Sequence, residues 1–183
     1  MNWLNTILIL AAAFVAVFFS ATFNVLRLVL GAQIDLLPSL MVYAALSQGM
    51  VSVTLLALAG GFWFDSLSAN PLGISVPSLF LIGFVLQRYH GLILRTEVFA
   101  QASLGLAASA LAPALTVLLL LSTQARPLIG WFSLWQWLVM AAAGAAFAPV
   151  WFWIFDWLNM LLNYRPWEEM TFRADREIKR GRQ

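Results

Sequence analysis

Residues 36–64 form a run of 29 residues that contains no charged side chain. As one α-helix, with a rise of about 1.5 Å per residue, the run would be roughly 43 Å long, whereas the hydrocarbon core of a bilayer is about 30 Å thick. The polar tripeptide Ser47–Gly49 interrupts the run near its middle. We therefore predict two short spans, about 37–47 and 50–65, joined by a tight turn. One long tilted helix is the alternative.

The composition of the whole chain agrees with this local pattern. Hydrophobic residues make up 62% of the 183 residues and charged residues only 10%. A soluble domain contains roughly 25% charged residues. A water-soluble fold of this size could not bury so much apolar surface, so the surplus must face lipid. The composition therefore predicts an all-α integral membrane protein.

Glycine, proline and acidic residues mark the ends of the other apolar runs. The breaks are the segment 31–38, the polar loop 65–73, the basic connector 88–97 and the loop 123–130. The remaining spans are then about 4–25, 74–87, 98–121 and 133–161, the last bent at Pro149. We predict a bundle of six transmembrane helices over residues 1–163, with five helices as the alternative. We read the first span as a retained helix, and a signal peptide cleaved near Ser20 is the alternative.

The distribution of charge predicts the orientation. Six of the ten Lys and Arg residues lie in the tail, residues 164–183, so the C-terminus is expected to be cytoplasmic. Residues 1–163 hold four positive and four negative side chains, and the net charge of +2 therefore comes from the tail. A basic tail of this kind does not indicate nucleic-acid binding. It is either a solvated segment near anionic lipid headgroups or a docking strip for a cytoplasmic partner.

No arrangement of reactive residues points to an enzyme. The chain has no cysteine, one histidine (His90) and one lysine (Lys179), so metal sites and phosphate-binding loops have no ligands at the required spacing. Ser75 is not part of a G-x-S-x-G motif. The predicted topology places Asp65 and Asp156 on opposite sides of the membrane, which excludes a shared-proton pair between them. We expect no catalytic residue, no cofactor and no metal.

Aromatic and small residues suggest how helices could pack. Six of the nine tryptophans lie between residues 131 and 157. They are either an aromatic belt at the two interfaces or a docking face for a partner helix, formed by Trp135, Trp151, Trp153 and Trp157. Small residues four positions apart permit close helix approach, within this bundle or with a partner. These pairs are Gly105 and Ser109, Ala141 and Ala145, and Gly144 and Ala148.

The segment GGFWFDSLSANPLG, residues 60–73, places the carboxylate of Asp65 and a run of turn residues between two apolar spans. A charge at such a position is expensive, so its presence requires a reason. We predict that Asp65 is structural. Its carboxylate is expected to accept hydrogen bonds from the turn amides of Ser66–Asn70 and to determine where the third span ends.

The longer segment GGFWFDSLSANPLGISVPSLFLIGFVLQR, residues 60–88, resembles the signature of the MreD family of rod-shape-determining membrane proteins. The resemblance lies in a Gly-rich short span, an Asp followed by Leu-Ser, a small-residue loop ending in Leu-Gly, and a short span that closes on Arg. The positions that carry it are Gly61, Asp65, Ser68, Pro71, Gly73 and Arg88. It covers about 29 residues, and the rest of the chain agrees in hydropathy, length and the aromatic last span. The N-terminus lacks the basic residues common in that family.

The resemblance implies a non-enzymatic scaffold in the bacterial inner (cytoplasmic) membrane. It implies membership of the cell-elongation (rod) complex, which supports lateral peptidoglycan synthesis and cell shape. The implied partners are an MreC-like single-span protein, a RodA-like glycosyltransferase, a class B penicillin-binding protein and an MreB-like cytoskeleton. The family fold is similar to the substrate-binding subunits of ECF vitamin transporters. The alternative is therefore a small-molecule-binding subunit that uses Asp65, Ser66, Ser68 and Asn70.

Overall fold

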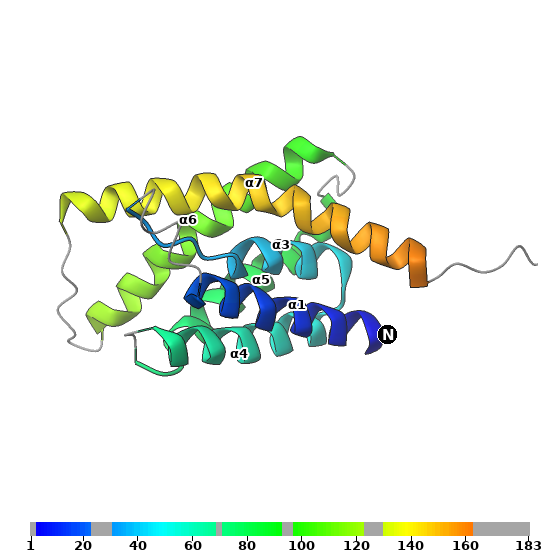
Figure 1. Ribbon diagram of the computed structural model, residues 1–183, viewed down its shortest axis with the longest axis horizontal. Helices are drawn as coiled ribbons and strands as arrows, with labels where there is room; N and C mark the ends of the chain where they lie inside the picture. Colours follow the sequence, from blue (N-terminus) through cyan, green and yellow to red (C-terminus); the bar gives the residue numbers. More distant parts are fainter. Residues whose placement is uncertain (1–2, 23–30, 69–70, 93–96, 123–129, 163–183) are drawn as a thin grey trace, which may run out of the picture.

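The computed structural model describes residues 3–22, 31–68, 71–92, 97–122 and 130–162. Within these ranges the protein is entirely helical (Figure 1). The predicted tail, residues 164–183, lies outside the described residues. The elements are α1 (Trp3–Thr22), α3 (Leu37–Ser47), α4 (Met50–Leu67), α5 (Ser75–Arg88), the 3-10 turn η1 (His90–Leu92), α6 (Val98–Ser122) and α7 (Trp131–Leu162).

The predicted division of the long apolar run is confirmed. α3 ends at Ser47 and α4 begins at Met50. Between them, Gln48 and Gly49 both adopt extended backbone conformations, with φ/ψ values of −124°/173° and −82°/169°. Two consecutive extended residues cannot continue an α-helix, so the alternative of one long tilted helix is wrong.

The helices form one bundle around α3. α3 contacts each of α1, α4, α5, α6 and α7, while α6 pairs with α7 and α4 pairs with both α1 and α5. The start of α1 and the end of α7 lie at the same end of the bundle (Figure 1). This arrangement is that of a chain that crosses the bundle an even number of times. α7 contains Pro149 and descends in its orange half in Figure 1, which agrees with the predicted bend.

α3 is surrounded by protein rather than by lipid. All ten residues from Leu37 to Leu46 are buried. A helix of 11 residues is about 16 Å long, roughly half the hydrocarbon thickness. On the α7 side, the ring of Tyr43 stacks on Phe155 at a centroid distance of 4.4 Å and meets Phe152 edge-on at 5.1 Å. The predicted six-helix bundle therefore contains a short central helix that the other helices enclose.

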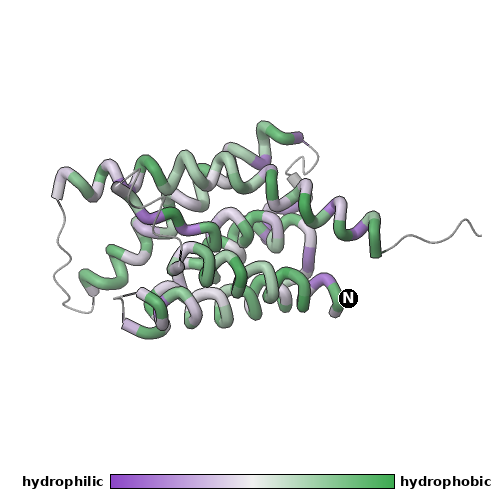
Figure 2. The backbone as a smooth tube through the Cα atoms, viewed as in Figure 1, coloured by the Kyte–Doolittle hydropathy of each residue, from purple (hydrophilic) through white to green (hydrophobic). Residues whose placement is uncertain are grey.

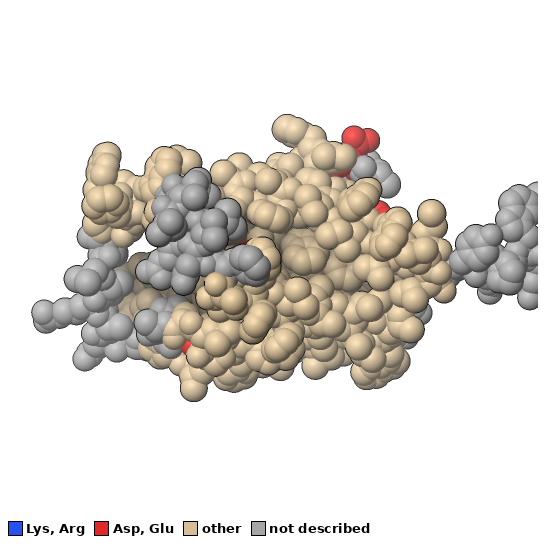
Figure 3. Space-filling model, viewed as in Figure 1, with Lys and Arg blue, Asp and Glu red and all other residues tan. Residues whose placement is uncertain are grey.

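The outer surface has the character expected of a membrane protein. Four helices, α1, α4, α6 and α7, are long and apolar enough to cross a membrane, and α3 and α5 are shorter apolar helices. Apolar residues recur along the length of these helices (Figure 2), and the face shown in Figure 3 carries very few charged side chains among its described residues. Phe and Leu side chains are exposed on every one of the four long helices, and exposed Trp side chains lie on α1 and α7.

Helices α6 and α7 approach each other closely where they cross. A Cβ atom on Gly105 would collide with the carbonyl of Gly144, and a Cβ atom on Gly144 would collide with the side chain of Ser109. Ala148 completes the contact on the side of Gly105. The small residues at these four positions therefore serve packing within this bundle, which was one of the two interpretations of their spacing.

Candidate functional site

Asp65 lies near the end of α4 and is only 1% exposed. Its Oδ2 accepts a hydrogen bond from the backbone N–H of Ser75 at 3.0 Å, and its Oδ1 accepts one from the Ser75 hydroxyl at 2.5 Å. Ser75 is the first residue of α5, so the carboxylate satisfies a backbone donor that the helix itself leaves unpaired. Asp65 therefore joins the end of α4 to the start of α5.

Among the described residues, the partner of the Asp65 carboxylate differs from the predicted ones, and the predicted amides of residues 69 and 70 lie outside the described residues. The carboxylate was expected to bind the amides of Ser66–Asn70, but its bonds come from Ser75, ten residues along the chain. The reason is that α4 continues to Leu67, so the turn does not begin directly after Asp65. The backbone N–H of Ser68 donates instead to the main-chain oxygen of Asp65 at 3.3 Å. Asn70 lies outside the described residues.

The other motif residues shape the same connection. Gly61 permits the close approach of α4 to α5, because a Cβ atom there would lie 3.0 Å from both the backbone nitrogen and the Cα of Val76. The carbonyl of Pro71 accepts a hydrogen bond from Ile74, and Gly73 adopts a φ of 88° that disfavours other residues. Arg88 is exposed in the last turn of α5, away from this connection.

A second buried carboxylate, Asp35, occupies an equivalent place at the start of α3. It is 8% exposed, and its Oδ1 accepts a hydrogen bond from the backbone N–H of Leu37 at 2.9 Å. The segment before it is held to α7, since the side-chain amide of Gln136 bonds both the N–H and the carbonyl of Gln33. Asp35 was not predicted as a site residue from the sequence. The available signal was an Asp immediately before an apolar run with Pro38 in its first turn, which is a helix-start pattern.

Burial changes the acidity of Asp35, which precedes α3 and lies outside the helices. Loss of solvation raises the pKa of its carboxyl from 3.8 to about 6, the Leu37 amide opposes this change, and the negative charge of Asp65 adds to it. The charge of Asp65 therefore contributes to the electrostatic surroundings of Asp35. Each one binds the N-terminus of a short helix, and both short helices begin at the same end of the bundle.

A cavity of about 210 Å³ lies beside these helix starts. Its polar lining consists of Asp35, Ser75, Ser78 and Thr116, and the hydroxyls of the last two lie 3.2 Å apart. Its other walls are apolar and include Phe64, Leu79 and Leu120. The structure thus brings together polar residues from three separate segments, the stretch before α3 and the helices α5 and α6, and only Ser75 among them was considered from the sequence.

A larger groove of about 610 Å³ adjoins this cavity between α6 and α7. Pro113, Val117 and Met140 line both spaces, so the two share a wall. The groove is mainly apolar, with Phe132, Leu134 and Trp137 among its lining residues. The indole N–H of Trp137 donates to the carbonyl of Ala110, three residues before Pro113, and so anchors the two helices at this level.

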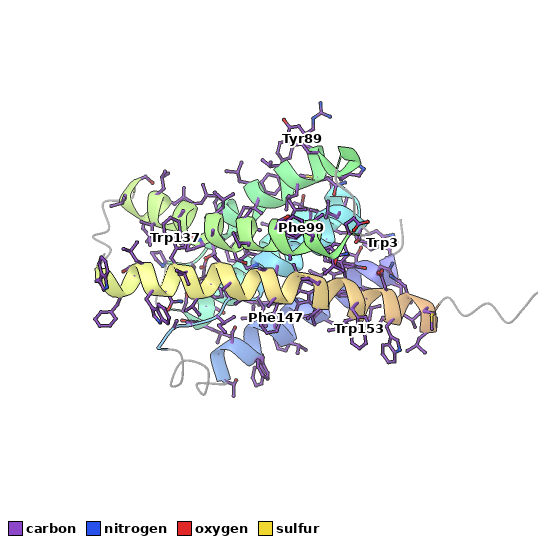
Figure 4. All side chains as sticks on the ribbon, turned by 90° about the horizontal axis from the view of Figure 1, so that it is seen from above. Trp3, Tyr89, Phe99, Trp137, Phe147 and Trp153 are labelled. Atoms are coloured by element: carbon purple, nitrogen blue, oxygen red, sulfur yellow. The ribbon has the colours of Figure 1, made fainter. Side chains whose placement is uncertain are left out.

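The four tryptophans proposed as partner contacts divide into two groups. Trp135, Trp153 and Trp157 are 51%, 70% and 53% exposed, and Trp153 projects outward from the side of α7 in Figure 4. Trp151 is half-buried, and its indole N–H donates to the hydroxyl of Ser39 on α3 at 3.2 Å. Trp151 therefore contributes to packing inside the bundle, while the other three form an outward surface.

The remaining reactive side chains do not converge on one place. His90 is exposed, and its Nδ1 lies 2.7 Å from the carbonyl of Gln87. Asp156 borders the start of α6 with Val98 and Gln101, whereas Asp65 borders the start of α5. Within the described residues, no three His, Cys, Asp or Glu side chains are grouped in a way that could hold a metal ion.

The fold and its apolar surface define a polytopic, all-α membrane protein. Comparison with protein-family models, with curated proteins and with solved structures finds no match. The similarity to the MreD signature therefore rests on residues 60–88 alone.

Proposed function

We propose that this protein is a non-enzymatic scaffold subunit of a bacterial cell-elongation complex, as its similarity to the MreD signature implies. In this proposal it resides in the inner membrane with a cytoplasmic C-terminus. It supports lateral peptidoglycan synthesis through contacts with an MreC-like single-span protein, a RodA-like glycosyltransferase and a class B penicillin-binding protein, beside an MreB-like cytoskeleton.

One observation carries the proposal: the motif residues are used to brace helices. Gly61 allows α4 and α5 to touch, Asp65 binds the start of α5, and Gly73 provides the turn between them. An active site needs reactive groups that a substrate can reach, whereas Asp65 is almost fully buried and both of its oxygens are engaged. A signature that serves the architecture supports a scaffold rather than an enzyme.

The long helix α7 offers a surface for a partner helix. Its exposed residues recur every three or four positions, as expected for one face of a helix. We name this surface the α7 stripe, and it consists of Trp135, Leu138, Ala142, Ala146, Val150, Trp153 and Trp157. The two alanines at its centre permit close approach of another helix, and the tryptophans at each end supply large contact areas. The single membrane helix of an MreC-like protein fits these requirements.

Site-specific photocrosslinking in native membranes tests this proposal. A photoreactive residue at Ala146 is expected to capture a single-span protein with a coiled-coil periplasmic region. The same residue at Val15, which is 61% exposed on α1, serves as the control and is expected to capture lipid. Capture of the single-span protein from Val15 but not from Ala146 would assign the contact to another face. Normal rod shape after deletion of the gene would contradict the proposed function itself.

The alternative function is that of a small-molecule-binding subunit of an ECF-like transporter. The hydroxyls of Ser66 and Ser68 donate to the carbonyls of Trp63 and Asp65 within their own turn, and neither residue lines the cavity near Asp35. The existence of that cavity is the observation that favours ligand binding. Co-purification with an ATPase pair, or a bound vitamin in native mass spectrometry, would support this alternative.

A further inference from the structure

Asp35 is a buried carboxylate that is only partly satisfied. Its Oδ1 accepts one hydrogen bond, from the Leu37 amide, and no other hydrogen bond or ion pair is formed by its side chain among the described residues. A carboxylate with pKa of about 6 is mostly ionised at neutral pH. A buried anion normally has a positive partner, because its desolvation is otherwise uncompensated.

The cavity beside Asp35 can accept such a partner. The hydroxyl oxygens of Ser75, Ser78 and Thr116 line it, and no Lys, Arg or His is among the described residues that line it. The Ser75 hydroxyl proton points to Asp65, so the lone pairs of this oxygen remain acceptors. The second buried acid, Asp65, adds negative potential and so raises the pKa of Asp35 further. The site therefore favours a cation that donates hydrogen bonds.

The apolar groove next to the cavity indicates which chemical group the cation carries. The polar cavity and the apolar groove share the residues Pro113, Val117 and Met140. A ligand that fills both spaces needs a positive polar group at one end and a hydrocarbon part at the other. The combined shape is unsuited to a bare metal ion, which prefers a closed set of oxygen ligands. A zwitterionic phospholipid fits less well, since none of the described residues that line the two spaces is a basic side chain that could bind its phosphate.

We propose that this cavity binds the ammonium group of a small single-chain amphiphile, with the hydrocarbon chain lying in the groove between α6 and α7. The three N–H donors of a primary ammonium match the free oxygen of Asp35 and the hydroxyls of Ser78 and Thr116. This site is separate from the α7 stripe, and the inference does not depend on the proposed scaffold function.

Ligand-induced stabilisation of the purified full chain tests the proposal. The unfolding midpoint is measured in detergent at about pH 8, where Asp35 is ionised, with octylammonium as the probe. Octanol, which has the same chain without charge, and octanoate, which has the opposite charge, control for partition into the micelle. Octylammonium is expected to raise the midpoint in a saturable way, and the two control compounds are expected not to do so.

Asp35→Asn and Met140→Trp test separately the binding of the ammonium group and the binding of the hydrocarbon chain. D35N is expected to weaken octylammonium binding at least about tenfold, because it removes the charge while keeping the shape. D156N removes an exposed acid near the start of α6 and is the matched control, expected to bind as the unmodified protein does. Met140→Trp fills the shared wall of cavity and groove, and is expected to weaken octylammonium binding but leave the binding of ethylammonium unchanged.

The proposal is overturned if D35N binds octylammonium as tightly as the unmodified protein, or if octanol stabilises the protein equally well. It is also overturned if Met140→Trp has no effect on the longer amine. Should D35N fail to fold, the proposal is tested with Thr116→Val and Met140→Trp. Both variants are expected to weaken octylammonium binding, and unchanged binding in both would overturn the proposal. Stabilisation by phosphatidylethanolamine vesicles in place of octylammonium would assign the site to a membrane lipid instead.

Discussion

Asp65 shows how one charged residue can organise two helices. Both of its carboxylate oxygens bind Ser75, one through the backbone and one through the hydroxyl. The bonds are formed in a buried site, where loss of the acceptor would leave the two donors of Ser75 unpaired. The free-energy cost of burying the Asp65 carboxyl group is therefore offset by its two hydrogen bonds to Ser75.

Asp65→Ala is therefore expected to lower the free energy of unfolding by about 2–4 kcal/mol, because the Ser75 donors are left buried without an acceptor. Unfolding in mixed micelles, followed by circular dichroism, measures this change. Ser75→Ala removes only the hydroxyl bond and is expected to cost less. In a double-mutant cycle, strictly additive effects of the two changes would contradict a direct interaction between these residues.

Asp35 predicts a pH dependence of stability. Its carboxyl has a pKa of about 6 in the folded protein against an ordinary value of 3.8, so the folded state binds the proton more tightly than the unfolded state does. The contribution of Asp35 to stability is therefore expected to be most favourable below about pH 4 and to fall, by about 3 kcal/mol in total, as the pH rises to about 6 and beyond.

The measurement compares unfolding midpoints of the unmodified protein and Asp35→Asn over this pH range. The difference between the two curves isolates Asp35 from Asp65 and the other acids. A difference that does not change with pH would show that burial leaves the Asp35 proton affinity unaltered.

At the scale of the elements, the bundle depends on short helices and on close crossings. α3 and α5 are shorter than a full span, and each begins at a buried carboxylate. The longest helices, α6 and α7, meet where glycine allows backbone contact. Small residues bring helices close enough for dispersion forces to hold them in a lipid environment, where the hydrophobic effect does not.

Gly144→Ala is expected to destabilise the α6–α7 pair by about 1–3 kcal/mol, because the added methyl group would overlap with Ser109 and with the Gly105 carbonyl. Gly91→Ala is the matched control, since nothing lies within 4 Å of the added atom and no loss of stability is expected. Thermal unfolding of both variants in the same detergent provides the comparison. Equal unfolding midpoints for the two variants would show that the α6–α7 crossing is not tightly packed.

For the whole molecule, the arrangement of helices predicts where the chain ends lie. The start of α1 and the end of α7 occupy the same end of the bundle, and the loop after α4 lies at the other end. A six-helix protein in a membrane therefore has both ends on one side, whereas the five-span alternative would separate them.

Single cysteines can test this arrangement cleanly, because the chain contains no cysteine of its own. Cysteines at Trp3 and at Leu162 are expected to react with a membrane-impermeant reagent from the same side of the membrane, and a cysteine at Leu72 from the opposite side. The charge distribution further predicts that the first two are cytoplasmic. If the cysteines that replace Trp3 and Leu162 react from opposite sides of the membrane, an odd number of crossings is favoured.

Hydropathy and helix-breaking residues were sufficient to locate every described helix. The predicted spans 37–47 and 98–121 match α3 and α6 to within one residue, because runs of apolar residues bounded by Gly, Pro or polar residues are local signals. The interruption at Ser47–Gly49 could also be predicted, because a single helix over residues 36–64 would be longer than the membrane is thick.

Tertiary structure alone decided which residues meet. That α3 is the enclosed helix, that Asp65 binds Ser75, and that Trp151 faces inward to Ser39 depend on how separate helices pack. Asp35 is the clearest case, because its burial and its place in the cavity require α3, α5 and α6 together. Periodicity reports the surroundings of one helix at a time, whereas a cavity is a property of several helices whose packing no local pattern encodes.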